Sequence, residues 1–248
     1  SSIEETMVGL RQFGSGQKGL ISIGLLSSVA RNLLPAASEK LSEKFPEIEL
    51  DILEISPKEA IDLLYGRQLS VAVLAEDSIA KSILSFSKTN LFEDPYVLAV
   101  PKSVSLENIK SLEDLKSSPV RKALSNIIQF EFGNQHKKRI EEWFTSVLPN
   151  SKVFAKTRTY EVALSMVQSG RGVAVIPALA ARLSGNLDFD VNLYRTNLPV
   201  RKIVSLIPSQ YIRIEPYKSF IEALSDSGKN IKLPNIHKVP PILESLSL

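Results

Sequence analysis

The sequence predicts an α/β fold in which largely parallel strands alternate with helices. An apolar run at residues 20–26 is followed by apolar residues at helical spacing as far as Leu41. Isoleucine and leucine then alternate with acidic residues over 48–52, which is the period of a strand. A second helical stretch and another apolar run at 69–75 continue the alternation. This β-α-β-α-β order implies a parallel sheet with right-handed crossovers.

Local signals mark the ends of the first two helices. The first is expected to end at Phe45 and Pro46, because the residue before a proline avoids the α region. In the stretch 56–59, a serine suits the N-cap, a proline the first helical position and a glutamate the third position. This arrangement is a capping box, so we expect the second helix to begin here and to end at Gly66.

The rest of the chain resumes the same alternation. A strand bracketed by prolines is expected at 95–101, and further strands at 126–130, 152–156, 173–176, 191–194 and 201–207. Further helices are expected at 112–115, 135–147 and 160–169, with another opening at Pro216. Trp143 and Phe144 are interpreted as core residues of the helix at 135–147. Residues from 227 onward contain three prolines and little periodicity, and we predict an irregular tail.

Composition excludes several classes of function. Thirty basic residues against 27 acidic ones give a formal charge of +3, which is too slight an excess to predict nucleic-acid binding. The absence of cysteine excludes disulfides, thiolate metal sites and a cysteine nucleophile within these residues. No apolar run near the start is long enough to span a bilayer, and the first 18 residues lack the apolar region of a signal peptide. We therefore expect a cytoplasmic chain.

No set of residues supports an enzyme. The only histidines are His136 and His237, and His136 lies on a polar helix face, where we expect it to be solvated. Nucleophile-elbow, phosphate-loop and dinucleotide-binding motifs are all missing. Glu4 and Glu5, like Glu141 and Glu142, are neighbours in the sequence. Neighbouring residues do not lie on the same face of a helix, so neither pair is expected to be a catalytic pair of carboxylates. We expect no catalytic residue, no metal and no cofactor.

A binding site is better supported, at the junctions between strands and helices. Ligands of open α/β sheets settle beyond the carboxyl ends of the strands, where helix N-termini attract carboxylates and similar anions. The candidate ligand-binding residues at these junctions are Ser27, Ser28, Ser56, Gln129, Phe130, Glu131, Thr157, Arg158 and Thr159. The alternative is that the hydroxyl residues are ordinary N-caps, each worth about 1 kcal/mol, and that Arg158 is a solvated arginine.

Several motifs in order resemble one known family. The segments GLISIG at 19–24, LLP at 33–35 and FPEIEL at 45–50 resemble the opening of the effector domains of LysR-type transcriptional regulators. Further segments that resemble this family follow at 63–73, 93–101 and 166–177. Ser70 departs from the pattern, since it replaces the usual aspartate. The match runs from about Gly19 to Leu224.

The resemblance implies a fold like that of type 2 periplasmic binding proteins. Two subdomains with mixed, mainly parallel sheets would flank a cleft, and the chain would cross between them twice. The expected boundaries are 1–18 for the end of a linker helix and a linker, 19–96 with 198–226 for regulatory subdomain I, 97–197 for regulatory subdomain II, and 227–248 for the tail. The family begins with a DNA-binding domain, which is absent from this chain.

The resemblance also implies a function and a site. The chain would bind a small anionic or polar metabolite in the cleft, contact DNA only through the missing domain, and form a homodimer or homotetramer without a membrane partner. Ser27, Ser28 and Ser56 would face the ligand from one subdomain, and Phe130, Glu131 and Thr157 to Thr159 from the other. Glu131 disfavours an acidic ligand. The alternatives are an extracytoplasmic solute-binding protein of a transport system and an enzyme on the same fold.

Overall fold

The computed structural model of the protein describes residues 19–80, 85–131 and 134–244. The expected linker helix end and linker at 1–18 lie outside the described residues. The chain forms two compact units, the first made of Ser1–Phe92 and Lys202–Ile231, the second of Glu93–Arg201 and Lys232–Leu248. The chain therefore passes between the units three times. The passage after Ile231 is one that the sequence did not predict.

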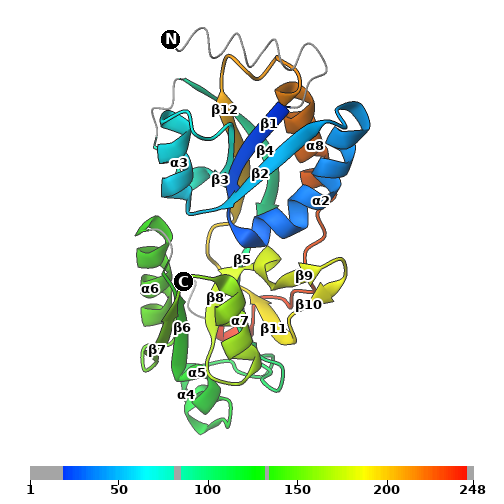
Figure 1. The fold of residues 1–248 in the computed structure, drawn as a ribbon. Coiled ribbons are helices and arrows are strands. Elements are labelled where there is room, and N and C mark those ends of the chain that lie inside the picture. The colour runs from blue at the N-terminus through cyan, green and yellow to red at the C-terminus, as the bar shows by residue number, and fades with distance from the viewer. Residues whose placement is uncertain (1–18, 81–84, 132–133, 245–248) are drawn as a thin grey trace. The chain divides into compact units, whose positions relative to one another are not determined.

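A five-stranded sheet with the order β2-β1-β3-β12-β4 forms the centre of the first unit (Figure 1). Its strands are β1 (Gly19–Leu25), β2 (Ile48–Glu54), β3 (Val71–Ala75), β4 (Phe86–Asp94) and β12 (Arg201–Pro208). Its helices are α2 (Ser27–Lys44), α3 (Pro57–Tyr65), the short η1 (Glu76–Ser78) and α8 (Tyr217–Lys229). Strand β1 is parallel to both β2 and β3, whereas β12 is antiparallel to β3.

Helices cover both faces of this sheet. Val71 and Val73 of β3 pack into one core with residues of α2 and α8. The intervening Ala72 and Leu74 pack into a second core with residues of α3. All five residues of β3 are buried, as is usual for a strand with helices on both sides, and this explains its continuous apolar sequence.

The capping box at the start of α3 is confirmed. The Ser56 hydroxyl accepts the Glu59 amide N–H at 3.2 Å, and the Glu59 carboxylate accepts the Ser56 amide N–H at 2.9 Å. The hydrogen bond from the Ser56 hydroxyl is the main cause that lowers the pKa of Glu59, and the bond from the Ser56 amide adds to it. The ionised form of Glu59 is therefore the one that stabilises the folded state.

Replacing Ser56 with alanine is expected to lower the free energy of unfolding by about 1 kcal/mol, because the two hydrogen bonds that its hydroxyl makes with Glu59 are lost, whereas the bond from the Ser56 amide N–H remains. The pKa of Glu59 is lower in the folded chain, so its contribution is present above the ordinary glutamate pKa of about 4.3 and is lost as the pH falls further. Urea unfolding followed by circular dichroism at neutral and acidic pH measures both effects. Ser42→Ala, on the exposed side of α2, is the matched control and is expected to change little. If Ser56→Ala lowered the free energy of unfolding by the same amount at the most acidic pH as at neutral pH, ionised Glu59 would not contribute to the cap.

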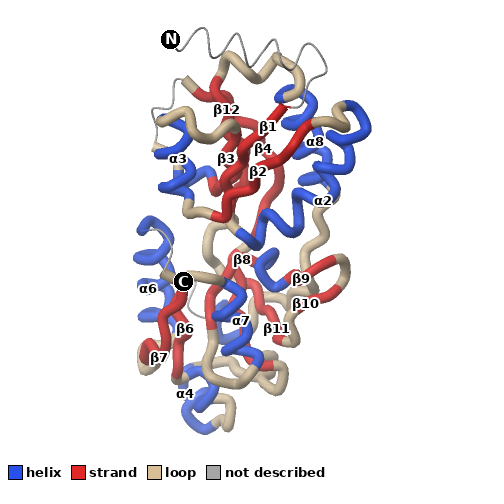
Figure 2. Tube along the Cα trace, in the orientation of Figure 1, coloured by secondary structure: helices blue, strands red, loops and turns tan. Residues whose placement is uncertain are grey.

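The second unit contains a three-stranded sheet, β11-β5-β8, and two strand pairs, β6-β7 and β9-β10 (Figure 2). The strands are β5 (Tyr96–Pro101), β6 (Asn126–Phe130), β7 (Lys152–Thr157), β8 (Ala174–Pro177), β9 (Arg182–Ser184), β10 (Leu187–Asp188) and β11 (Val191–Arg195). The helices are α4 (Leu112–Ser117), α5 (Arg121–Leu124), α6 (Asn134–Val147), α7 (Tyr160–Gln168), the short η2 (Ala178–Ala181) and α9 (Pro241–Glu244). Strands β6 and β7 are parallel, and β5 is antiparallel to both of its neighbours.

The predicted fold class is confirmed, since both units combine helices with mixed sheets. Trp143 and Phe144 of α6 are core residues, as expected. His136 is not solvated as predicted: it is half-buried, and its ring centroid lies 5.8 Å from that of Tyr96. Strand β4 was not predicted, because serine, lysine, threonine and asparagine interrupt its apolar residues. Among the described helices, none combines the length and apolarity that a membrane crossing requires.

The C-terminal tail is part of the second unit. The His237 amide N–H donates to the Leu193 carbonyl at 2.7 Å, and the Arg195 amide N–H donates to the His237 carbonyl at 3.0 Å. Ile242 and Leu243 of α9 are buried in the same core as Trp143. Residues 232–244 therefore extend the β11 edge and complete this core, although their sequence shows little periodicity.

Candidate functional site

The first group of candidate residues lies at one edge of the first unit's sheet. Strands β1 and β2 are in register from Gly19 to Leu25, so that Leu25 is opposite Glu54. The Ile55 amide N–H continues this pairing by donating to the Leu25 carbonyl at 3.1 Å. Ser27, Ser28 and Ser56 follow directly, so they emerge at the carboxyl edge where open α/β sheets bind ligands.

Ser56 is committed to the capping box. Besides accepting the Glu59 amide N–H, its hydroxyl donates to Glu59 Oε2 at 2.7 Å. The N-cap interpretation therefore describes Ser56, and a ligand that used this hydroxyl would compete with the cap.

Ser27 and Ser28 are not N-caps. The N-cap of α2 is Leu26, whose side chain makes no capping hydrogen bond, and the two serines lie within the first turn. Ser28 is 1% exposed, and its Oγ has no hydrogen-bond partner among the described residues. A buried hydroxyl without a partner costs about 1–3 kcal/mol. The positive end of an 18-residue helix and an unsatisfied hydroxyl thus coincide, which favours an acceptor atom supplied from outside the chain.

The second group of candidates lies at the carboxyl ends of β6 and β7. Phe130 is opposite Thr157, and the Glu131 amide N–H donates to the Thr157 carbonyl at 2.7 Å. Thr159 is the N-cap of α7, because its Oγ1 accepts the Val162 amide N–H at 3.3 Å.

Arg158 lies between the two threonines and projects from the second group's edge. It is exposed and makes no ion pair with any residue that the structure describes. Its guanidinium lies two residues before the start of α7, where the helix dipole also attracts negative charge. This end of the second unit can therefore receive an anion.

Two stacked aromatic rings lie at the carboxyl end of β6 and the start of α7. The rings of Phe130 and Tyr160 are stacked, with centroids 3.9 Å apart and an interplanar angle of 21°. Tyr160 is the first residue of α7 and is buried. Burial raises the pKa of its phenol, and the nearby Tyr96 adds to the effect, so the group stays neutral. Sequence reasoning did not include Tyr160, although its position directly after the Thr159 cap was a usable signal.

Glu131 is held by two lysines. Its carboxylate lies 2.8 Å from Lys137 Nζ and 3.3 Å from Lys156 Nζ. The hydrogen bond from Lys137 and then that from Lys156 lower the pKa of Glu131, and the Glu131 bond raises the pKa of Lys137. The charge that seemed to disfavour an acidic ligand is thus balanced, and sequence reasoning missed both lysines.

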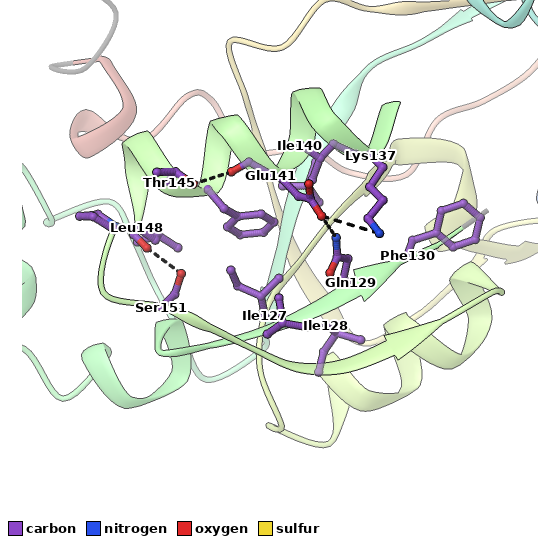
Figure 3. A pocket seen from close by; sticks show the side chains of 14 residues that line it. Ile127, Ile128, Gln129, Phe130, Lys137, Ile140, Glu141, Thr145, Leu148 and Ser151 are labelled. Carbon is purple, nitrogen blue, oxygen red and sulfur yellow. Dashed lines mark hydrogen bonds and ion pairs between the residues drawn. The ribbon is translucent and has the colours of Figure 1, made fainter. Parts of the chain in front are cut away.

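Gln129 points toward α6. It is buried, and its Nε2 donates to Glu141 Oε1 at 2.6 Å (Figure 3). Glu141 Oε1 also lies 3.9 Å from Lys137 Nζ. The nine predicted residues therefore divide into Ser27, Ser28 and Ser56 in the first unit and the other six in the second, with Gln129 turned from the strand ends toward the helix.

The family of the chain follows from comparison with known proteins. Residues 14–229 match the family described as the LysR substrate binding domain. The chain belongs to this family. It is 22% identical over 241 residues to a probable RuBisCO transcriptional regulator of Phaeodactylum tricornutum, covering 92% of this chain and 73% of that protein. It is 26% identical over 200 residues to the malonate utilization transcriptional regulator of Klebsiella pneumoniae, covering 80% of this chain and 62% of that protein.

Solved structures show the same fold. The Corynebacterium glutamicum OxyR C206 mutant matches with a TM-score of 0.65 at 17% identity, over 93% of this chain and 71% of that one. The effector binding domain of a BenM variant matches with a TM-score of 0.60 at 17% identity, over 87% of this chain and 98% of that one. The LysR-family chain therefore has the expected fold, similar to type 2 periplasmic binding proteins. It spans roughly half to three quarters of its curated relatives, as the coverages of 53% and 73% illustrate.

Proposed function

We propose that the chain is the effector-binding domain of a LysR-type transcriptional regulator and that it binds a small anionic or polar metabolite. The observation that carries this proposal is the buried Ser28 hydroxyl, which has no hydrogen-bond partner among the described residues and lies at the N-terminus of α2, in a chain of this family. The curated relatives named above are transcriptional regulators, which supports a sensor in preference to an enzyme or a transport protein.

The proposed ligand is held by both groups of strand-end residues. Ser27 and Ser28 offer hydroxyls and the N-terminal backbone N–H groups of α2 from the first unit, and the stretch 157–159 with Phe130 offers Arg158 and a ring face from the second. Arg158 suits a carboxylate, because a guanidinium can bind it through two parallel bonds. The lysines that balance Glu131 remove the main electrostatic objection.

Ligand binding would act by population shift. A ligand that contacts both units binds one arrangement of them more tightly than another, and so favours that arrangement. No bond in the ligand is made or broken. In the full-length protein this change would reach a DNA-binding domain. Full-length CbnR, a solved structure of the same fold, is itself in complex with its target DNA. Association into a homodimer or homotetramer in the cytoplasm belongs to the same proposal.

Replacing Ser28 with alanine is expected to weaken ligand binding by about three- to tenfold, and Arg158→Ala by about tenfold or more, because one neutral and one charge-assisted hydrogen bond are lost. The probes are malonate, succinate, citrate and benzoate, screened by thermal shift and then titrated by calorimetry. Without ligand, Ser28→Ala is expected to be at least as stable as the original chain, since no hydrogen bond of the described residues is broken. A purely structural serine would instead lose stability.

The controls are Ser42→Ala near the C-terminal end of α2 and Arg171→Ala at another exposed position of the second unit. Both are expected to bind the probes as the original chain does. Full-strength binding by Ser28→Ala and Arg158→Ala would remove both residues from the site, and equal losses in the controls would show a nonspecific effect.

A further inference from the structure

A cavity of about 260 Å³ lies within the second unit, between α6 and the pair β6-β7, and it shares Gln129 and Phe130 with the second group of candidate residues (Figure 3). We call it the α6–β7 groove. Its apolar lining comes from Ile127, Ile140, Phe144, Leu148, Val153 and Val175. Four of these side chains belong to the buried core, so the floor of the groove is the core surface itself.

Exposed apolar surface of β7 borders the groove at Val153. In the pair β6-β7, Val153 is opposite Ile127, and the register then shifts so that Ala155 is opposite Ile128. Such a bulge bends the strand, and it leaves Phe154 outside the pairing. Val153 is 46% exposed although it lines an apolar hollow next to a buried isoleucine. This apolar surface gains free energy when a ligand removes it from water.

One end of the groove is polar but balanced in charge. Lys137 lies between the carboxylates of Glu131 and Glu141, at 2.8 Å and 3.9 Å, and Lys156 also contacts Glu131. Two positive and two negative charges therefore offset one another. A charged ligand would have to leave water and disrupt this network, which is costly. The groove consequently suits a neutral molecule.

An uncharged hydrogen-bond acceptor, Gln129 Oε1, lies at this end of the groove. Gln129 donates its amide N–H to Glu141, and its Oε1 accepts no hydrogen bond from the described residues. At the other end, the Ser151 hydroxyl donates to the Leu148 carbonyl at 2.6 Å and the Thr145 hydroxyl donates to the Glu141 carbonyl at 2.9 Å. These hydroxyls are already satisfied as donors. A ligand with a donor group opposite Gln129 would therefore pair with its Oε1.

We propose that the α6–β7 groove is a second ligand site, for a neutral aromatic molecule of one or two rings that carries one N–H or O–H donor. The size agrees, because a 150 Å³ apolar cavity holds benzene and drug-sized ligands occupy about 300 Å³ or more. The site lies wholly within the second unit. It does not depend on Ser28 or Arg158, so it goes beyond the proposed function.

The test uses three matched probes with the 248-residue chain. Indole fills the groove and offers one N–H donor, 1-methylindole has the same rings without the donor, and indole-3-carboxylate adds a negative charge. Indole is expected to bind about three- to tenfold more tightly than 1-methylindole, which is the worth of one hydrogen bond. Indole-3-carboxylate is expected to bind more weakly than either. Calorimetry or ligand-observed NMR measures the three affinities.

Val153→Phe is expected to abolish indole binding, because the new ring occupies the hollow from an edge position that the core does not need. The matched control is Val162→Phe on α7, which starts from a similarly exposed valine, 49% against 46%, that does not line the groove. This control is expected to leave indole binding unchanged. Gln129→Met is expected to equalise the affinities for indole and 1-methylindole.

Two outcomes would overturn this proposal. Indole that does not bind, or that binds Val153→Phe as well as it binds the original chain, shows that the groove is not the site. A preference for indole-3-carboxylate shows that the ligand class is wrong. Ser28→Ala is expected to bind indole normally, so a failure here is distinguishable from a failure of the proposed function.

Discussion

Replacing Arg201 with methionine is expected to lower the free energy of unfolding by about 3–5 kcal/mol. Arg201 and Asp94 form a buried ion pair, 2.8 Å from Nη2 to Oδ2, with side-chain exposures of 4% and 0%. The other Asp94 oxygen accepts the Leu179 amide N–H at 3.0 Å. Burial opposes the charge on Arg201, but Asp94, with Tyr160 and Tyr96, more than offsets this and raises the pKa of the guanidinium. Removing Arg201 leaves a buried carboxylate without its counter-charge.

The two residues lie where the chain passes between the units. Asp94 follows the passage after Phe92, and Arg201 precedes the passage to Lys202. Their ion pair therefore links the two chain segments at which the second unit begins and ends its stretch 93–201. Urea unfolding followed by the fluorescence of Trp143, the single tryptophan, reports on this unit.

A double variant separates charge from packing. Asp94→Asn combined with Arg201→Met keeps an acceptor for Leu179 and removes both charges, so it is expected to be more stable than Arg201→Met alone. Lys58→Met, which breaks an exposed pair with Asp62, is expected to cost less than about 0.5 kcal/mol. An Arg201→Met variant as stable as the Lys58→Met control would contradict a structural role for the buried pair.

A chain that ends at Ile231 is expected to lose at least about 4 kcal/mol of stability in the second unit, because deletion of a buried Leu or Ile side chain typically costs 2–5 kcal/mol. The deletion removes Ile242 and Leu243 from the core that contains Trp143. It also removes the Leu233 carbonyl, which accepts a hydrogen bond from Arg182 Nη2 at 2.9 Å. The fluorescence of Trp143 during urea unfolding measures the loss.

Leu243→Ala provides a milder version of the same change. It is expected to cost about 2–5 kcal/mol, whereas Lys238→Ala at an exposed position of the same tail is expected to change stability by less than about 0.5 kcal/mol. If Leu243→Ala unfolded at the same urea concentration as Lys238→Ala, the tail would not be part of this core.

Local signals in the sequence account for most of the fold. Period-two alternation located β2, the serine and glutamate of the capping box located α3, and the proline after Phe45 marked the end of α2. Strand β4 and the tail were missed for a common reason. Both segments adopt a regular structure because they pair with residues far away in the chain, β4 with β12 and His237 with Tyr194. Their own sequences lack the periodicity that would reveal this.

The candidate site was predictable in part. Strand ends and helix starts can be located from sequence, which is why Ser28 and Arg158 could be proposed. The sequence does not reveal whether a hydroxyl forms a hydrogen bond within its own helix. Ser56 bonds to Glu59, whereas Ser28 has no partner among the described residues. The lysines that balance Glu131 come from α6 and β7, and only the folded chain brings them together.

The most direct test of the proposed effector site is a single NMR titration of the isotope-labelled chain with a carboxylate that stabilises it in the thermal-shift screen. We expect the backbone amides of 27–28 and of 157–159 to shift together, in both units, with one dissociation constant. Shifts confined to one unit, or two groups of shifts with separate dissociation constants, would contradict a ligand shared by the two strand-end groups. If none of the four carboxylates stabilises the chain or shifts these amides, the proposed anionic ligand is wrong.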